Sequence, residues 1–195
     1  MAVVSIKNKL RRGNLLVGNE AYDPGAFYPI ATTTVGSGGS SSVTFSNIPS
    51  TYTHLQVRGF YNLTSAVTNF TYFRLNNDTT STNYATHIFY GNGTGASTFA
   101  ATSSSGRDYH LFQVANGAQQ PIPFILNILD YANTNKYKVS RLLYGSDDNT
   151  GGRQEVGLMS GLYMSTSAVS RLDFVIGGGN IAQYSHFALY GIKSA

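Results

Sequence analysis

The sequence predicts an all-β fold, an antiparallel jelly-roll-like β-sandwich preceded by an extended or short-helical N-terminal arm. About ten short runs of strand-forming residues follow one another, separated at close spacing by Gly, Asn and Ser turns. No long amphipathic helix is visible after the arm, and charged residues make up only 11% of the chain against about 25% in ordinary domains. The 14 Tyr and 11 Phe provide large side chains for a core, which separates this composition from that of a disordered chain. We therefore expect one sandwich domain over residues 27–195, with residues 1–26 as the arm.

The arm holds the net charge of the chain. Residues 1–12 contain four cations and no acid, whereas residues 13–195 contain nine basic and nine acidic residues. Four charges make a small footprint for nucleic acid or an anionic membrane, so we expect neither of these partners. A solvated tail stays open, but we favour a docking peptide that is steered by charge and fixed by apolar side chains. The expected anchoring residues are Val3, Val4, Ile6, Lys7, Lys9, Leu10, Arg11 and Arg12.

Local patterns predict the first elements. Residues 8–17 fit a short helix, and residues 18–25 fit a loop. Residues 36–42 are rich in Gly and Ser and fit a long hairpin turn. Further loops are expected at residues 76–83, 91–106, 147–152 and 177–180.

Alternation of apolar and polar residues predicts the main strands and their buried faces. In residues 54–61, Leu55, Val57 and Tyr61 share one face. In residues 122–129, apolar residues occur on both faces, because Ile125 and Leu129 oppose the main apolar series, and we expect burial on both sides.

Three later strands follow the same pattern. Tyr137 and Val139 are expected to face the core, opposite Lys138 and Ser140. The next buried series is Leu172, Phe174 and Ile176, and the last is Phe187 and Leu189.

No constellation in the sequence indicates catalysis or a cofactor. The absence of Cys removes disulfides, thiolate metal sites and cysteine nucleophiles, and no G-x-S-x-G motif is present. The histidines, at positions 54, 87, 110 and 186, lack the spacing of a metal pair and are expected to be structural or surface residues. A calcium-type loop starting at Asp147 would need an acid at Leu158, so a turn is favoured. We therefore expect that the protein is not an enzyme and that it binds neither a cofactor nor a metal ion.

Aromatic side chains near the loops suggest one binding function. Tyr84, Tyr90 and Tyr109 lie close to Asn, Gly and Ser loops, and aromatic faces beside hydrogen-bonding side chains suit sugars. These three tyrosines are the candidates for glycan contact. The alternative is that they are core and interface residues.

Two end segments carry a resemblance. Residues 27–59 read FYPIATTTVGSGGSSSVTFSNIPSTYTHLQVRG, and residues 185–193 read SHFALYGIK. Together with LLVGN at residues 15–19, they resemble virion structural proteins of tailed bacteriophages, particularly phages of aquatic bacteria. The resemblance implies a jelly-roll sandwich on the virion surface, usually trimeric and without catalytic residues. It also implies that residues 54–61 and 186–192 are neighbouring strands, with Gly59 and Gly191 at points of close backbone approach.

The expected function is therefore a non-enzymatic surface protein of a phage virion. It would be a capsid decoration (cement) or short tail-fibre subunit, assembled in the host cytoplasm and held on the particle by its arm. Its expected partners are other virion proteins of the capsid or tail and two further copies in a homotrimer. Export would need another route than a signal peptide, such as cell lysis, because no signal segment is visible. The alternative is a carbohydrate-binding adhesin that recognises host surface glycans, and a polysaccharide-degrading enzyme is a more distant rival that needs two acids across a cleft.

Overall fold

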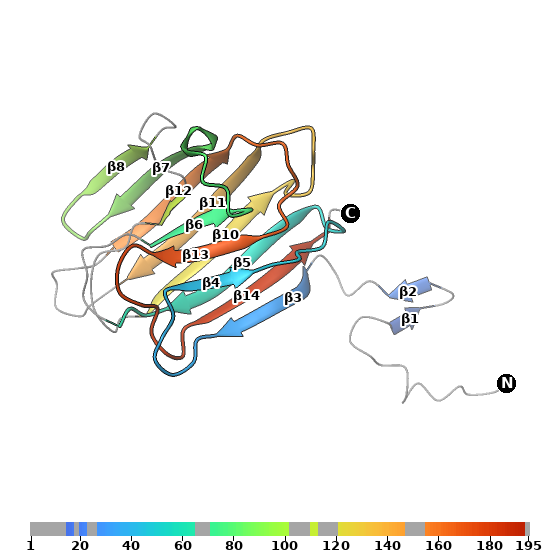
Figure 1. The fold of residues 1–195 in the computed structure, drawn as a ribbon, viewed down its shortest axis with the longest axis horizontal. Coiled ribbons are helices and arrows are strands. Elements are labelled where there is room, and N and C mark those ends of the chain that lie inside the picture. Colours follow the sequence, from blue (N-terminus) through green and yellow to red (C-terminus); the bar gives the residue numbers. More distant parts are fainter. Residues whose placement is uncertain are drawn as a thin grey trace.

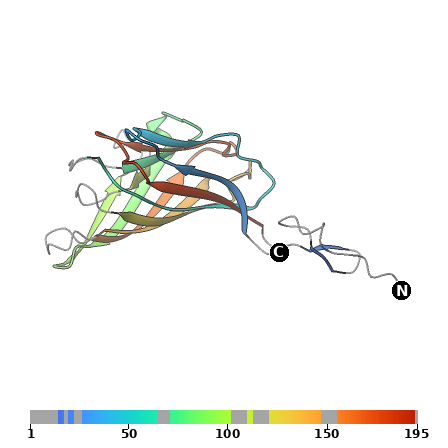
Figure 2. The same ribbon diagram turned by 90° about the horizontal axis from the view of Figure 1, so that it is seen from below.

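The computed structural model describes residues 15–17, 20–22, 27–64, 71–101, 110–112, 121–146 and 155–193. Within these ranges all regular structure is β-strand, apart from the single 3-10 turn η2 (Ser81–Asn83). Two antiparallel sheets of unequal width lie face to face, as Figures 1 and 2 show. The expected all-β sandwich is confirmed.

The large sheet has eight strands, and every neighbouring pair is antiparallel. In spatial order they are β3 (Phe27–Thr34), β14 (His186–Ile192), β5 (His54–Tyr61), β10 (Ile122–Leu129), β11 (Lys138–Ser146), β12 (Glu155–Tyr163), β7 (Tyr84–Gly91) and β8 (Ala96–Ala101). The small sheet contains β4 (Ser42–Phe45), β13 (Leu172–Ile176), β6 (Thr71–Leu75) and β9 (His110–Phe112). A separate pair joins β1 (Leu15–Val17) to β2 (Glu20–Tyr22).

The connectivity is that of a jelly roll with two inserted hairpins. Strands β3, β4, β5 and β6 pair in turn with β14, β13, β10 and β9, so a long antiparallel hairpin is rolled across both sheets. The hairpins β7–β8 and β11–β12 interrupt this path, and both join the large sheet beyond β10. The insertions explain why the large sheet is twice as wide as the small one.

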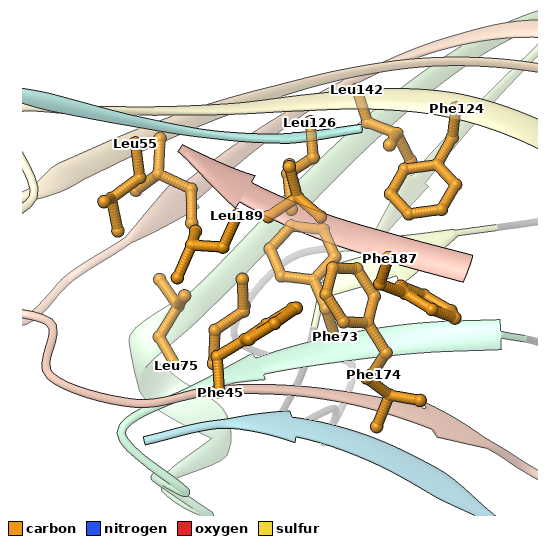
Figure 3. Close-up of a cluster of buried hydrophobic side chains, with 14 of the residues drawn as sticks. Phe45, Leu55, Phe73, Leu75, Phe124, Leu126, Leu142, Phe174, Phe187 and Leu189 are labelled. Carbon is orange, nitrogen blue, oxygen red and sulfur yellow. The ribbon is translucent and has the colours of Figure 1, made fainter. Parts of the chain in front are cut away.

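The core lies between the two sheets, and Figure 3 shows its aromatic centre. Phe174 on the small sheet packs against Phe124 and Phe187 on the large sheet, with ring centroids 5.6 and 5.1 Å away. These buried rings and their aliphatic neighbours remove a large apolar area from water, which is the main favourable term in folding.

The structure corrects the expectation for three local segments. Residues 15–17 and 20–22 are the strands β1 and β2 rather than part of a helix and a loop. The expected loop at residues 91–106 contains β8, which pairs with β7. Residues 36–42 do not close a hairpin, because β3 and β4 belong to different sheets. Gly38 and Gly39, with φ of 88° and 73°, allow the chain to turn from one sheet to the other there.

The buried face is also corrected in two strands. In β11 the chain buries Lys138 and Ser140, while Tyr137 is exposed. The phase is set by Leu142 and Tyr144, which continue the same inward series, and a strand has only two faces to choose from. In β10 the inward face is as predicted. The opposite face is not fully buried, because the small sheet covers only one side: Ile125 is exposed and Leu129 is half-buried.

Other predictions are confirmed. Strand β5 spans the predicted residues 54–61, and β14 is its neighbour, as the resemblance implied. A side chain at Gly59 would meet the backbone of β14, and one at Gly191 would meet the ring of Tyr52. The close approach is therefore to backbone at Gly59 and to an aromatic side chain at Gly191.

Candidate interaction surface on the large sheet

The outer side of the large sheet exposes a row of apolar side chains. Successive residues of a strand point to opposite faces, so the residues that alternate with the buried core residues point outward. Register brings four of these outward residues into one line across four strands: Phe89 on β7, Leu158 on β12, Leu143 on β11 and Ile125 on β10. All four are exposed.

A second line runs beside the first and contains small residues. Val156 on β12 lies between Gly145 on β11 and Gly91 on β7. Beyond Gly145 lie Pro123 on β10, which borders the same hollow as Gly145, and its register partner Phe60 on β5. Two shallow hollows open on this side, one bounded by Gly91 and the other by Gly145, and Val156 borders both. We call the exposed apolar residues of both lines the outer apolar face: Phe60, Phe89, Ile125, Leu143, Val156 and Leu158.

Charge is sparse on this surface. Its described cations are Arg58 and Arg141, and no acidic side chain occurs in the described strands on this side. The guanidinium of Arg58 lies 5.0 Å from the centroid of the Phe27 ring and 5.9 Å from that of Tyr190. Its Nε also donates a hydrogen bond to Gln56. The Arg58 guanidinium thus already has contacts with Phe27, Tyr190 and Gln56 of its own chain.

The described acids near the core and turns have partners of their own. Burial raises the pKa of Asp78, but hydrogen bonds from Asn83, Thr80 and Tyr163 outweigh this effect and hold it below its ordinary value. The hydrogen bond from Lys136, 2.8 Å from the Asp130 carboxylate, lowers the pKa of that acid.

The other two acids are buried. Asp173 accepts hydrogen bonds from Arg171 and from the Thr44 hydroxyl, the latter at 2.6 Å. Glu155 accepts one from the Tyr144 hydroxyl at 2.5 Å. Their contacts join neighbouring strands and suit structural roles.

The histidines lie on four different strands. His110 is fully buried between the rings of Phe73 and Tyr84, and burial lowers its pKa to about 3. Its Nδ1 lies 3.2 Å from the Thr86 hydroxyl, and its Nε2 has no hydrogen-bond partner in the described part of the chain. His87 is exposed on the outer side of β7. In the described ranges no group of three or more His, Cys, Asp or Glu residues is placed to hold a metal ion.

Of the candidate glycan residues, the structure describes Tyr84 and Tyr90. Tyr84 is 1% exposed, and its hydroxyl donates to backbone oxygens of Leu75 and Asp78 while it accepts from the Leu75 amide. The prediction that Tyr84 contacts a glycan is therefore wrong, because its inward phase on β7 places it in the core. Tyr90 is half-buried and packs against the core.

The remaining predicted site residues cannot be placed. Tyr109 lies outside the described residues, as do all the anchoring residues of the arm, from Val3 to Arg12, and the calcium-type segment that starts at Asp147. The expectations about them stay predictions.

Sequence reasoning missed most of the outer apolar face. Leu143 on β11 and the pair Val156 and Leu158 on β12 occupy the outward phase, while the inward phase of each strand mixes apolar with polar or glycine residues. The signal that identifies such a face is a run of large apolar residues in the phase that alternates with the buried one. Pairing then shows that the outward residues are adjacent.

Comparison with protein-family models, curated proteins and solved structures found no match to this chain. Among the described residues, no helix has the length and apolar character needed to cross a lipid bilayer.

Proposed function

We propose that this chain is a non-enzymatic structural subunit of a phage virion, either a capsid decoration subunit or a short tail fibre. One observation carries the proposal. The two segments on which the resemblance rests lie more than a hundred residues apart, yet they form one structural unit. Residues 27–59 supply β3, β4 and most of β5, and residues 185–193 supply β14, which lies between β3 and β5. Apart from β4 in the small sheet and residues 15–19, the resembling segments thus form one contiguous part of the large sheet, β3-β14-β5.

The fold agrees with the proposal. The resemblance implies a jelly roll, and the pairing of β3, β4, β5 and β6 with β14, β13, β10 and β9 has that connectivity. A fold by itself is shared by proteins of many functions, so the assignment to a virion depends on the resemblance.

The arm supplies the proposed anchor. Its four cations and its apolar residues suit attachment to another virion protein, of the capsid or the tail. The sandwich would then project from the particle, and the chain would be assembled with the particle in the host cytoplasm.

The test is the composition of particles. Virions purified to constant composition are analysed by mass spectrometry, and an antibody against the recombinant chain is imaged on them with immunogold. The proposal expects peptides of this chain in the particles and label confined to the head or the tail. Peptides found only in the unassembled lysate would overturn it.

A second experiment tests the anchor. Deletion of residues 1–12 should leave a folded protein that no longer joins particles. Replacing Lys7, Lys9, Arg11 and Arg12 by Gln tests charge, and replacing Val3, Val4, Ile6 and Leu10 by Ser tests apolar contact. If charge dominates, attachment of the parent chain also weakens as salt rises. Normal occupancy by the deleted chain would contradict the anchor.

The alternative function is a carbohydrate-binding adhesin. Of its three candidate tyrosines, Tyr84 is in the core and Tyr109 lies outside the described residues, which leaves Tyr90. No observation on the described surface favours it over the structural proposal. A glycan array probed with the full chain and with the Tyr90→Ala variant would detect such an activity.

A further inference from the structure

We infer that the outer apolar face is a self-association surface, and that a second copy of this chain covers it. The inference goes beyond the proposed function, because it names a partner and a surface and follows from the face itself, whatever particle the chain belongs to. Three properties of the face carry it: its size, its shape and its lack of charge.

The size of the face is that of an interface. The exposed fractions of the six side chains are 60% for Phe89, 65% for Val156, 51% for Leu143, 50% for Leu158, 43% for Phe60 and 38% for Ile125. Together they present roughly 600 Å² of apolar side chain, at the upper limit of ordinary monomer patches and most of the about 800 Å² that each partner of a stable pair buries.

The shape of the face favours another copy of itself. Val156 stands between two glycines, Gly91 and Gly145, and a hollow lies on each side of it. One surface therefore presents both a projecting side chain and the space to receive one. Contact between identical copies needs this kind of self-complementary surface. In a twofold pair Val156 of each copy enters a hollow of the other, and in the expected homotrimer it enters a hollow of the next copy around the ring.

The charge of the face also favours a second copy. The six side chains of the face are apolar. Of the described cations beside it, Arg141 precedes Leu143 by two positions along β11, and Arg58, the register partner of Ile125, lines the hollow beside Gly145. Arg58 is already stacked against Phe27 and Tyr190. Two such faces can meet with Arg58 keeping these contacts at the edge of the hollow, whereas a strongly acidic or basic partner would find few charges to pair with.

The experiment measures the oligomeric state of the full chain. Sedimentation and native mass spectrometry are run up to about 100 μM protein, where association with a Kd of about 10 μM is readily seen. The wild-type chain should form a dimer or a higher closed oligomer. Val156→Asp and Leu158→Asp should each weaken association at least tenfold, because a charge would be buried without a partner.

The matched control is Tyr184→Asp. Tyr184 is an exposed aromatic, at 72%, in the turn before β14, and it is not one of the six residues of the outer apolar face. This variant should associate as the wild type does. Circular dichroism melts verify that the variants fold, and Val156→Ser gives a milder change if an acid prevents folding.

A labelling experiment gives an independent measurement. The chain has no Cys, so Val156→Cys provides a single position for a pyrene label. Pyrene excimer emission at micromolar concentration supports contact between two copies at this face. A wild-type chain that stays monomeric at about 100 μM, aspartate variants that associate normally, or a foreign protein found on the face in place of a copy would overturn the inference. None of these results would decide the virion proposal, which depends on particle composition.

Discussion

The carbonyl oxygen of His186 lies 2.2 Å from the place where a β-carbon on Gly59 would stand. Gly59 pairs with Phe187 across β5 and β14, so the obstructing atom belongs to the backbone of a central strand. The ring of Phe124 lies 3.2 Å from the same place. A side chain at Gly59 would therefore require two core strands to move apart.

Gly59→Ala is expected to destabilise the protein by about 2–3 kcal/mol, because the sheet cannot widen locally without losing hydrogen bonds and packing. The measurement is the free energy of unfolding from urea denaturation monitored by circular dichroism. Gly36→Ala is the matched control, since a β-carbon there meets nothing within 4 Å. Its effect should stay within about 0.5 kcal/mol. Equal stability of the two variants would contradict the close approach.

The pairing of β5 with β14 shows how far the sequence could lead. The alternation in residues 54–61 identifies a strand and its buried face correctly, because Leu55, Val57 and Tyr61 repeat with a period of two. That β14 lies beside this strand followed from the resemblance at the two ends. No local pattern shows which of many strands will be neighbours.

Long-range pairing also explains what the sequence could not reveal. Lys138 points inward because Leu142 and Tyr144, further along β11, occupy the same face of the strand. Its ammonium group is also held there by carbonyl oxygens of the β10–β11 turn and of the connection between β12 and β13. The outer apolar face exists only because register aligns residues of different strands, such as Leu143 and Leu158. Both features depend on contacts between segments, which short-range alternation does not report.

Lys138→Met is expected to cost about 3 kcal/mol of stability. The ammonium group is buried, with the residue 1% exposed, and it donates to the carbonyl oxygens of Asn133 at 2.5 Å, Lys136 at 2.7 Å and Thr166 at 3.2 Å. It thereby joins the β10–β11 turn to the connection between β12 and β13. Met fills a similar volume but leaves these acceptors unpaired, and hydrogen bonds to charged groups are worth about 1.5–3 kcal/mol each. Thermal and urea unfolding measure the loss.

Lys136→Met is the comparison for this variant. Lys136 is exposed and pairs with Asp130 at the surface, where an ion pair contributes at most about 1 kcal/mol. The Lys138 variant should therefore be clearly less stable than the Lys136 variant. The reverse order would show that the carbonyl contacts of Lys138 are not important for stability.

Tyr84→Phe should destabilise the protein by about 1–2 kcal/mol. It removes a buried hydroxyl that hydrogen-bonds to backbone groups of Leu75 and Asp78, and the Leu75 amide loses this oxygen as an acceptor. Tyr90→Phe on the same strand should change stability by less than about 0.5 kcal/mol, since Tyr90 is half-buried. Urea unfolding of both variants distinguishes a core role for Tyr84 from a surface role. If Tyr84→Phe kept full stability, the hydroxyl contacts would not be those described.

His110 should make stability fall as the medium becomes mildly acidic. Burial lowers its pKa to about 3 in the folded protein, from 6.5 in the unfolded chain. Between these values the unfolded chain binds a proton that the folded chain does not, so lowering the pH favours unfolding by about 1.4 kcal/mol per unit. Between pH 7 and pH 5 the expected loss is about 2 kcal/mol, and the Asp78 and Asp130 carboxylates, whose pKa values are lowered, stay ionised throughout.

His110→Gln tests whether His110 causes this loss of stability. Gln does not titrate, so the stability of the variant should no longer depend on pH in this way over the same range. His87→Gln is the matched control: His87 is exposed on the neighbouring β7, and removing it should leave the loss of about 2 kcal/mol in place. The measurement is the difference in unfolding free energy between pH 7 and pH 5 for the three chains. A slope that survives in His110→Gln and disappears in His87→Gln would mean that His110 takes up its proton in the folded state, which its burial between Phe73 and Tyr84 should prevent.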